Sequence, residues 1–346
     1  MAQTGTKAEI TGSRRRRRTL VSGGSGFIGS HLVPLLLERG DHVTVVDNLS
    51  TGRRGNLPDE HPSIRFIEAD LREALRVLGP GETFDEIYHL AAAVGVTRVL
   101  EDPILAIETN VEQTAALLRF AANRGPDGGP VPTLVASSSE VYGKAAKSPF
   151  SEEDDVLYGP TTVSRWSYAC TKAIDEYLAI AHHRMHGLPA VVARFFNTVG
   201  PRQVGDYGMV LPRFVGAALR GEPLHVFGDG GQTRCFCDVR DTAAALPRLL
   251  GSARCHGRVF NVGSDRPISI LELAETVIRV LSSRSTIQLR PYAEAYPDGF
   301  EDLRQRRPDL SRIRESIGFE PTIPLEVTIR DIAQSMRSTG MAETNA

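Results

Sequence analysis

The chain has 346 residues, and its 40 lysines and arginines nearly balance its 42 aspartates and glutamates, for a net charge of −2. This length exceeds a typical single core, so we expect one α/β domain with a smaller attached lobe. The balanced charge argues against nucleic-acid binding as the main function.

The first residues predict a flexible basic leader over 1–17, which holds most of a run of five arginines, Arg14 to Arg18. No apolar stretch before Gly23 is long enough for a signal peptide or a membrane span, so we expect a cytoplasmic protein without a membrane partner. Cys235 and Cys237 form a Cys-x-Cys pair with no further ligands at zinc spacing. We therefore expect reduced cysteines and no metal.

A nucleotide-binding turn follows the leader. A short strand, Thr19–Ser22, leads into a glycine-rich turn and a helix that stops near Gly40. The next strand, His42–Val46, ends in an acidic residue. Glycines at such a turn let the backbone approach a pyrophosphate, and the acid suits a ribose 2′-hydroxyl but repels a 2′-phosphate. The sequence predicts NAD, bound by Gly23, Gly26, Phe27, Ile28, Gly29, Asp47 and Asn48; Arg53 and Arg54 would weaken the preference for NAD over NADP if they folded back.

Strands and helices then alternate, which predicts a doubly wound, parallel, Rossmann-type sheet. We expect strands at Ile64–Glu68, Phe84–His89, Val131–Ala136 and Ala190–Arg194, and long helices at Ile104–Asn123 and Arg165–His186. Ligands bind beyond the carboxyl ends of such strands. The residues expected there are Asp70, Leu71, Ala91, Ala92, Asn110 and Ser137–Glu140.

The alternation is lost after Asn197, where prolines and glycines separate short elements. We predict a Rossmann domain of residues 18–196 and 238–262, a second lobe of 197–237 and 263–337, and a tail of 338–346. The acidic stretch Ser148–Ser164 is either a lid or a passive loop.

Tyr168 and Lys172 are four residues apart on one predicted helix, so they share a face. A free tyrosine has a pKa of about 10, and a nearby cation favours its phenolate. We expect the lysine and an oxidised nicotinamide ring to lower the pKa of Tyr168 enough for it to act as a base.

Taken together, these motifs resemble those of the extended short-chain dehydrogenase/reductases, over about residues 18 to 335. The motifs are the glycine-rich turn, Asp47-Asn48, His89-Leu90-Ala91-Ala92, Thr109-Asn110-Val111, Ser139-Glu140-Val141-Tyr142-Gly143 and the Tyr/Lys pair. Phe196 to Arg202 and Gly228 to Arg234 resemble the nucleotide-sugar branch, in which Asn197 and Arg234 would bind the nucleotide diphosphate. The resemblance implies a substrate site of Arg98, Asn197, Arg202, Arg213, Phe227, Gln232, Arg234 and Arg306.

Within that branch the chain resembles the UDP-glucuronic acid decarboxylases most. The segment Ser137–Gly143 is similar to their catalytic loop, and Gln305–Asp309 is similar to the segment that carries an active-site arginine, here Arg306. Val94–Arg98 lacks the proline-rich pattern of the eukaryotic members. Dehydratases carry an Asp-Glu pair where this chain has Ser139-Glu140, and many 4-epimerases lack an acid at Glu140.

The resemblance implies a homodimer built on the two long helices, and a defined reaction. Tyr168 would take the C4 hydroxyl proton, with Ser138 bonded to the same oxygen. The 4-ketone would then lose CO2, with Ser139, Glu140 and Arg306 holding the carboxylate, positioning water or protonating C5. UDP-xylose results, or UDP-4-keto-pentose if release comes first. The alternatives are a 4-epimerase, a 4,6-dehydratase and a non-enzymatic dinucleotide sensor.

Overall fold

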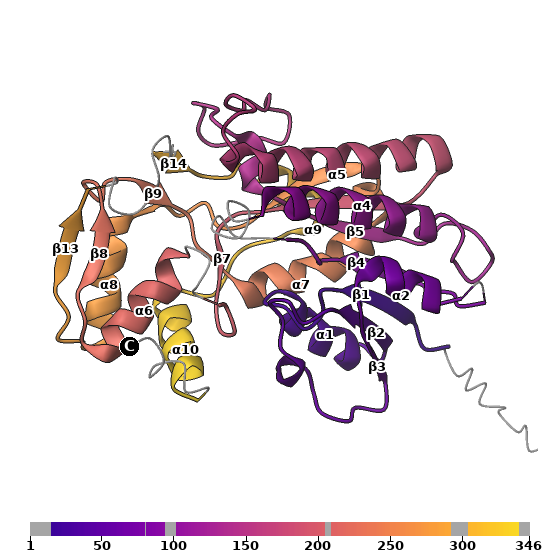
Figure 1. Ribbon diagram of the computed structural model, residues 1–346, viewed down its shortest axis with the longest axis horizontal. Coiled ribbons are helices and arrows are strands. Elements are labelled where there is room, and N and C mark those ends of the chain that lie inside the picture. Colours follow the sequence, from indigo (N-terminus) through magenta and orange to yellow (C-terminus); the bar gives the residue numbers. More distant parts are fainter. Residues whose placement is uncertain (1–14, 80, 94–101, 205–208, 292–303, 339–346) are drawn as a thin grey trace, which may run out of the picture.

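The computed structural model describes residues 15–79, 81–93, 102–204, 209–291 and 304–338. A seven-stranded parallel sheet with helices on both faces forms the larger part, and a smaller lobe lies beside it (Figure 1). The predicted doubly wound fold is therefore confirmed. Strands at the centre of the sheet are apolar on both sides because helices cover both faces.

The sheet has the strand order β11-β6-β5-β4-β1-β2-β3, and all of its neighbours are parallel. Each predicted strand and helix of this part is present, with ends that differ by at most two residues. The strands are β1 (Arg18–Ser22), β2 (His42–Asp47), β3 (Ile64–Glu68), β4 (Glu86–His89), β5 (Thr133–Ser138), β6 (Ala190–Phe195) and β11 (Arg258–Val262). The helices are α1 (Gly29–Glu38), α2 (Leu71–Val77), α4 (Pro103–Ala121), α5 (Arg165–His186) and α7 (Val239–Leu250).

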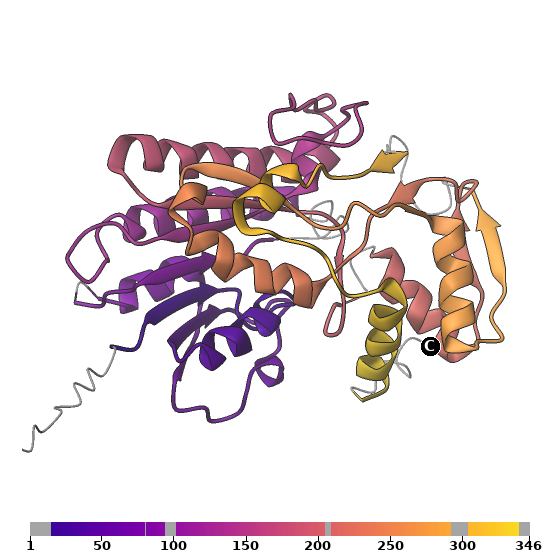
Figure 2. The same ribbon diagram turned by 180° about the vertical axis from the view of Figure 1, so that it is seen from behind.

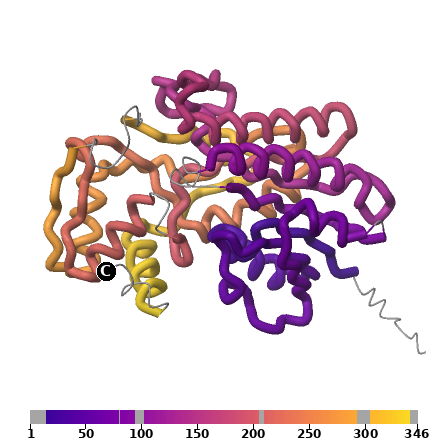
Figure 3. The backbone as a smooth tube through the Cα atoms, viewed as in Figure 1, coloured from indigo at the N-terminus to yellow at the C-terminus, as the bar shows by residue number. Residues whose placement is uncertain are grey.

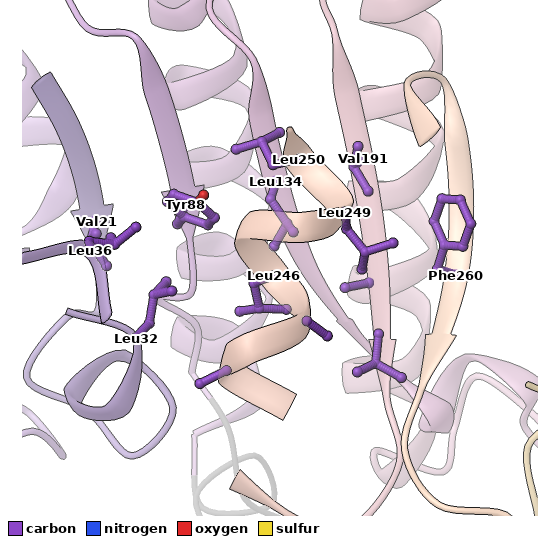
Figure 4. Close-up of a cluster of buried hydrophobic side chains, with 14 of the residues drawn as sticks. Val21, Leu32, Leu36, Tyr88, Leu134, Val191, Leu246, Leu249, Leu250 and Phe260 are labelled. Atoms are coloured by element: carbon purple, nitrogen blue, oxygen red, sulfur yellow. The ribbon is translucent and has the colours of Figure 1, made fainter. Parts of the chain in front are cut away.

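Neighbouring residues of each central strand enter two different cores. Leu134 packs with α1 and α7 on one face, whereas Val135 packs with α2, α4 and α5 on the other. This alternation follows from the two-residue period of a strand. Figure 4 shows the first core, in which Leu246 and Leu249 of α7 lie against Leu134 and Val191 of the sheet.

The second lobe has a separate core, formed mainly by α6 (Val210–Arg220), α8 (Ile270–Leu281) and α10 (Leu325–Ser338) against β8 (Leu224–Phe227) and β13 (Ile287–Arg290). Figure 2 shows these elements from behind, apart from the central sheet. The short strands are β7 (Thr198–Val199), β9 (Thr233–Arg234), β10 (Cys237–Asp238), β12 (Ile268–Ser269) and β14 (Gln305–Arg306).

The chain crosses between the two parts more often than the sequence predicts. Figure 3 shows orange and yellow tube in both parts. Leu310, Ile313 and Phe319, in and around α9 (Ser311–Ile317), pack into the sheet's core, although the sequence assigns all of 263–337 to the second lobe. Three apolar residues in and next to a two-turn helix carry no information about which core they enter. At the other end, Arg15 and Arg17 of the expected leader form ion pairs with Asp85 and Glu86.

Candidate active site

One cavity of about 640 Å³ lies at the carboxyl ends of the strands and extends to the second lobe. Its walls contain residues from both parts of the molecule, as the resemblance predicts for a dinucleotide and a nucleotide sugar. The predicted residues that line it are Gly23, Gly26, Phe27, Ile28, Gly29, Asp47, Asn48, Asp70, Leu71, Ala91, Ala92, Ser138, Ser139, Glu140, Tyr168, Lys172, Asn197, Arg213, Phe227, Gln232, Arg234 and Arg306.

The glycine-rich turn has no room for side chains. Gly23 has a φ of +72°, and a Cβ there would lie 2.7 Å from the backbone nitrogen of Ala91. A Cβ on Gly29 would lie 2.2 Å from the carbonyl oxygen of Gly23, so α1 begins directly against the turn. The backbone at the start of α1 is therefore open to the cavity, which is the arrangement that a pyrophosphate requires.

Asp47 organises this turn as well as facing the cavity. Its carboxylate accepts hydrogen bonds from the backbone N–H groups of Ser25 and Leu49, both at 2.9 Å. Of the two arginines that would oppose it, Arg54 stacks on the ring of Phe66 at 4.9 Å, and Arg53 is exposed. Neither lines the cavity, so the carboxylate is the charge that a 2′-phosphate would meet.

Three predicted site residues stand apart from this set. Asn110 is buried behind the wall, where its side chain bonds to the backbone of Ala93 and to the Thr171 hydroxyl. Arg202 does not line the cavity either, because its guanidinium donates to the carbonyl of Ser30 at 2.8 Å. The structure therefore gives no support to substrate binding by Arg202. Arg98 lies outside the described residues.

Tyr168 lies beside Ser138, as the sequence predicts, but its pKa is not lowered. Burial raises the pKa of Tyr168 above its ordinary value, the charge of Glu140 raises it further, and a hydrogen bond with Ser138 acts in the opposite direction. The ammonium of Lys172, which was expected to lower this pKa, donates to Asp175 and to the carbonyl of Ala136, each at 3.1 Å. The protein's own groups, without a bound cofactor, therefore keep Tyr168 protonated.

Glu140 is surrounded by arginines. It forms ion pairs with Arg306 and, at 3.6 Å, with Arg165 of α5. Burial alone would raise the pKa of Glu140, but the charges of Arg306, Arg165 and Arg234 outweigh it and hold the pKa below its usual value. Glu140 is therefore ionised near neutrality, and an ionised carboxylate can orient water or accept a proton but cannot donate one.

Arg306 reaches Glu140 through backbone pairing far along the chain. β14 lies parallel to β9, with Arg306 opposite Arg234, and both side chains line the cavity. Phe150 holds the next residues, because its backbone bonds to Arg307 at 2.8 Å and to Asp309 at 2.7 Å. The Phe150 ring is fully buried and stacks on Tyr142 at 4.6 Å. Phe150 is therefore a buried support for the segment that follows Arg306.

A buried ion pair lies beside the start of the segment Ser137–Gly143. Arg194 of β6 makes two hydrogen bonds to Glu176 of α5, at 2.9 and 2.7 Å. The same carboxylate accepts a hydrogen bond from the Ser137 hydroxyl at 2.5 Å. Removing one partner of such a buried pair costs several kcal/mol, so this group fixes the start of the segment that carries Ser138 and Glu140.

Sequence reasoning missed Arg165, Thr198 and Gln203, all of which line the cavity. The hydroxyl of Thr198 and the side-chain carbonyl of Gln203 are buried and have no hydrogen-bond partner within the described part of the chain. The sequence did contain a signal for Arg165, since it lies three residues before Tyr168 and so on the same helical face.

In the second lobe, the guanidinium of the predicted residue Arg213 lies over the ring of Phe227, 5.8 Å from its centroid.

Cys235 and Cys237 are buried free thiols, and burial raises the pKa of each to about 12. The residues that the structure describes contain no group of three His, Cys, Asp or Glu side chains that could hold a metal. None of the described helices has the length and apolar character needed to cross a membrane.

Known proteins share this architecture over nearly the whole chain. UDP-N-acetyl-alpha-D-glucosaminuronate decarboxylase of Bacillus cytotoxicus is 38% identical over 323 residues, which cover 93% of this chain and 98% of that protein. UDP-glucuronic acid decarboxylase 2 of Arabidopsis thaliana is 37% identical over 93% of this chain and 68% of its own length. These are relatives in sequence and not only in fold.

Among solved structures, the UDP-glucose 4-epimerase of Thermotoga maritima with UDP-glucose aligns with a TM-score of 0.82 and 28% identity, over 93% of this chain and 99% of that one. The dTDP-glucose 4,6-dehydratase of Streptomyces venezuelae with NAD aligns with a TM-score of 0.80 and 28% identity, over 94% and 99%. Residues 19–263 match the NAD dependent epimerase/dehydratase family. Because the match covers most of the chain and the cavity has that family's glycine turn and acid, the chain belongs to the NAD-dependent epimerase/dehydratase family and uses NAD.

Proposed function

We propose that this protein is a decarboxylase of a UDP-linked uronate, with UDP-glucuronate as its substrate and UDP-xylose as its product. The observation that carries the proposal is the cluster of Glu140, Arg306 and Arg165 beside Tyr168. Arg306 and Arg165 both lie against Glu140 there, so planar guanidinium groups are gathered beside the proposed base. Such groups bind carboxylates in a geometry that a uronate offers and a neutral hexose does not.

Bound NAD supplies a hydride acceptor for C4 of the sugar. The positive charge of oxidised NAD would favour the phenolate of Tyr168. The phenolate would then accept the proton of the C4 hydroxyl, and Ser138, which hydrogen-bonds to Tyr168, would orient the same oxygen. The resulting 4-ketone is β to the C6 carboxylate, so the electrons left by departing CO2 pass into an enolate. We assign Tyr168 and Ser138 to hold the enolate oxygen, because stabilising that charge is the main task left to the protein.

The arginines and Glu140 act around the leaving carboxylate. Arg306 and Arg165 orient it, and Glu140 keeps them in place and holds a water molecule near C5. The ionised state of Glu140 favours this role over donation of the C5 proton from its own carboxyl group. A proton delivered through the water, followed by reversal of the first step, completes the reaction.

A second candidate substrate is UDP-N-acetylglucosaminuronate, which differs at C2 and not at the reacting atoms. This substrate is favoured by the Bacillus cytotoxicus relative, which is a decarboxylase of that sugar. The alignment with this chain covers 98% of that relative's length. The 4-epimerase alternative is favoured only by structural neighbours of lower identity, such as the Thermotoga maritima enzyme.

The test is to incubate the protein with NAD+ and each of the two uronates, and to measure the masses of the products by mass spectrometry. Loss of CO2 supports the proposal, and the uronate with the higher kcat/KM is the substrate. An unchanged mass with inverted C4 would identify an epimerase, and loss of water a dehydratase; either result would refute the proposal.

We also propose that the protein is a homodimer through α4 and α5. Both helices carry large apolar residues on their exposed sides, including Ile104 (68% exposed), Ile107, Ile174 and Tyr177 (73% exposed). Exposed large apolar residues on two neighbouring helices support an interface there, and a two-fold contact would pair the same residues from each copy. The cytoplasmic location remains a prediction of the sequence.

A further inference from the structure

Lys172 is neutralised by a carboxylate that the proposed chemistry does not use. Its ammonium donates to Asp175 Oδ2 at 3.1 Å, and the two side chains are 3% and 0% exposed. A negative charge at this distance offsets part of the potential that the ammonium produces at a third group. The paired lysine therefore favours the phenolate of Tyr168 less than a lone ammonium would.

Lys172 is the counter-ion of Asp175, and the other polar groups near it in the described part of the chain have partners of their own. Glu176, the next residue on α5, is paired with Arg194. Thr114 of α4 bonds to His89 of β4 at 3.0 Å, and burial and the Lys172 charge lower the pKa of His89 to about 3, which keeps it neutral. Burial raises the pKa of Asp175, whereas Lys172 and the Thr114 hydroxyl oppose that rise.

Asp175 also acts on the phenol itself. It follows Tyr168 by seven residues, or two turns of α5, so both side chains lie on the same side of the helix. Its negative charge is one of the causes that raise the pKa of Tyr168, together with burial and Glu140. Asp175 thus opposes ionisation of Tyr168 directly and also weakens the lysine that would favour it.

We propose that Asp175 is a positioning residue that sets how strongly Lys172 favours ionisation of Tyr168, and so sets the pH range of the first oxidation. The proposal rests on the proposed role of Tyr168 as the base. It requires that the carboxylate act by its charge and not only by holding the lysine in place.

The sign of the expected effect follows from the charges. Asp175→Asn keeps the shape but removes the negative charge, so Lys172 acts on the phenol unopposed and the phenolate becomes more favourable. We expect the acidic limb of kcat/KM against pH to move about one unit toward lower pH, a shift typical of one nearby charge. Asp175→Glu keeps the charge, and the limb should stay at its original pH.

The decisive measurement needs neither substrate nor cofactor. Tyrosinate absorbance is titrated in the free protein, and subtraction of the Tyr168→Phe titration isolates Tyr168. The same pair of titrations is made in the Asp175→Asn background. A shift of about one unit to lower pH, restored by Asp175→Glu, supports the proposal. An unmoved titration together with a slower reaction would mean that Asp175 only holds the lysine, and would overturn it.

A second variant keeps the test valid if Asp175→Asn does not fold. Thr114→Val removes a hydroxyl that lowers the pKa of Asp175, and it changes no residue of α5. It should move the Tyr168 titration in the same direction by a smaller amount, and no movement would contradict the proposal. Because the titration uses no UDP-sugar, a failure of the uronate assay leaves this result independent.

Discussion

Replacing Glu140 with glutamine separates the two halves of the proposed reaction. The variant keeps the size of the side chain but leaves Arg306 and Arg165 without their shared counter-ion. At 3.6 Å and an effective dielectric constant of 20, the Arg165 attraction alone is about 4–5 kcal/mol before desolvation is counted. Glu140 is partly exposed, so we expect a smaller net effect of about 2.7 kcal/mol, which is a hundredfold fall in rate.

That fall should appear in the loss of CO2 and not in the first oxidation. With substrate labelled at C6, the release of labelled CO2 should slow about a hundredfold, while NADH absorbance should still rise and accumulate. Tyr168→Phe is the matched control for the other half. It keeps the ring but removes the base, so NADH formation should fall by about 10² to 10⁴.

The reasoning is refuted if Glu140→Gln releases CO2 at the rate of the unaltered protein. It is also refuted if this variant and Tyr168→Phe both suppress NADH formation equally, because Glu140 would then act on the oxidation. Circular dichroism and thermal unfolding of both variants serve to exclude a general loss of structure.

Four further predictions concern Arg306, the cofactor, Phe150 and the assembly. Arg306→Lys retains a charge but loses the planar fork, so it should resemble Glu140→Gln in accumulating NADH, and a first oxidation that fails instead would contradict the assignment. Calorimetry should show much tighter binding of NAD+ than of NADP+, since Asp47 lies in the cavity and Arg54 is stacked elsewhere; equal affinities would show that this account of Asp47 is wrong. Phe150→Ala should lower the free energy of unfolding by about 3–5 kcal/mol. It should also slow CO2 release, because the segment that carries Arg306 would lose its buried support. An unchanged rate of CO2 release would mean that the segment is held without the Phe150 ring. In light scattering at micromolar concentration the protein should be a dimer that Tyr177→Glu dissociates, and a monomeric unaltered protein would remove the proposed interface.

The sequence by itself determined the Rossmann sheet and the dinucleotide end of the cavity. Those features depend on short-range patterns: apolar runs for buried strands, glycines where backbone must lie close to backbone, and an acid at the end of the second strand. It also placed Tyr168 and Lys172 on one helical face, because a four-residue spacing fixes that relation without any tertiary contact.

Only the tertiary structure decided the charges around those residues. Arg306 lies beside Glu140 because β14 pairs with β9 and Phe150 holds the following segment, a contact between positions 166 residues apart. The packing of α9 into the sheet's core is likewise a long-range outcome. A local pattern states which face a side chain occupies, but a pKa depends on every charge and every layer of atoms near it. For that reason the sequence could predict Tyr168 as the proposed base with Lys172 on the same face, but it could not predict that the pKa of Tyr168 is raised.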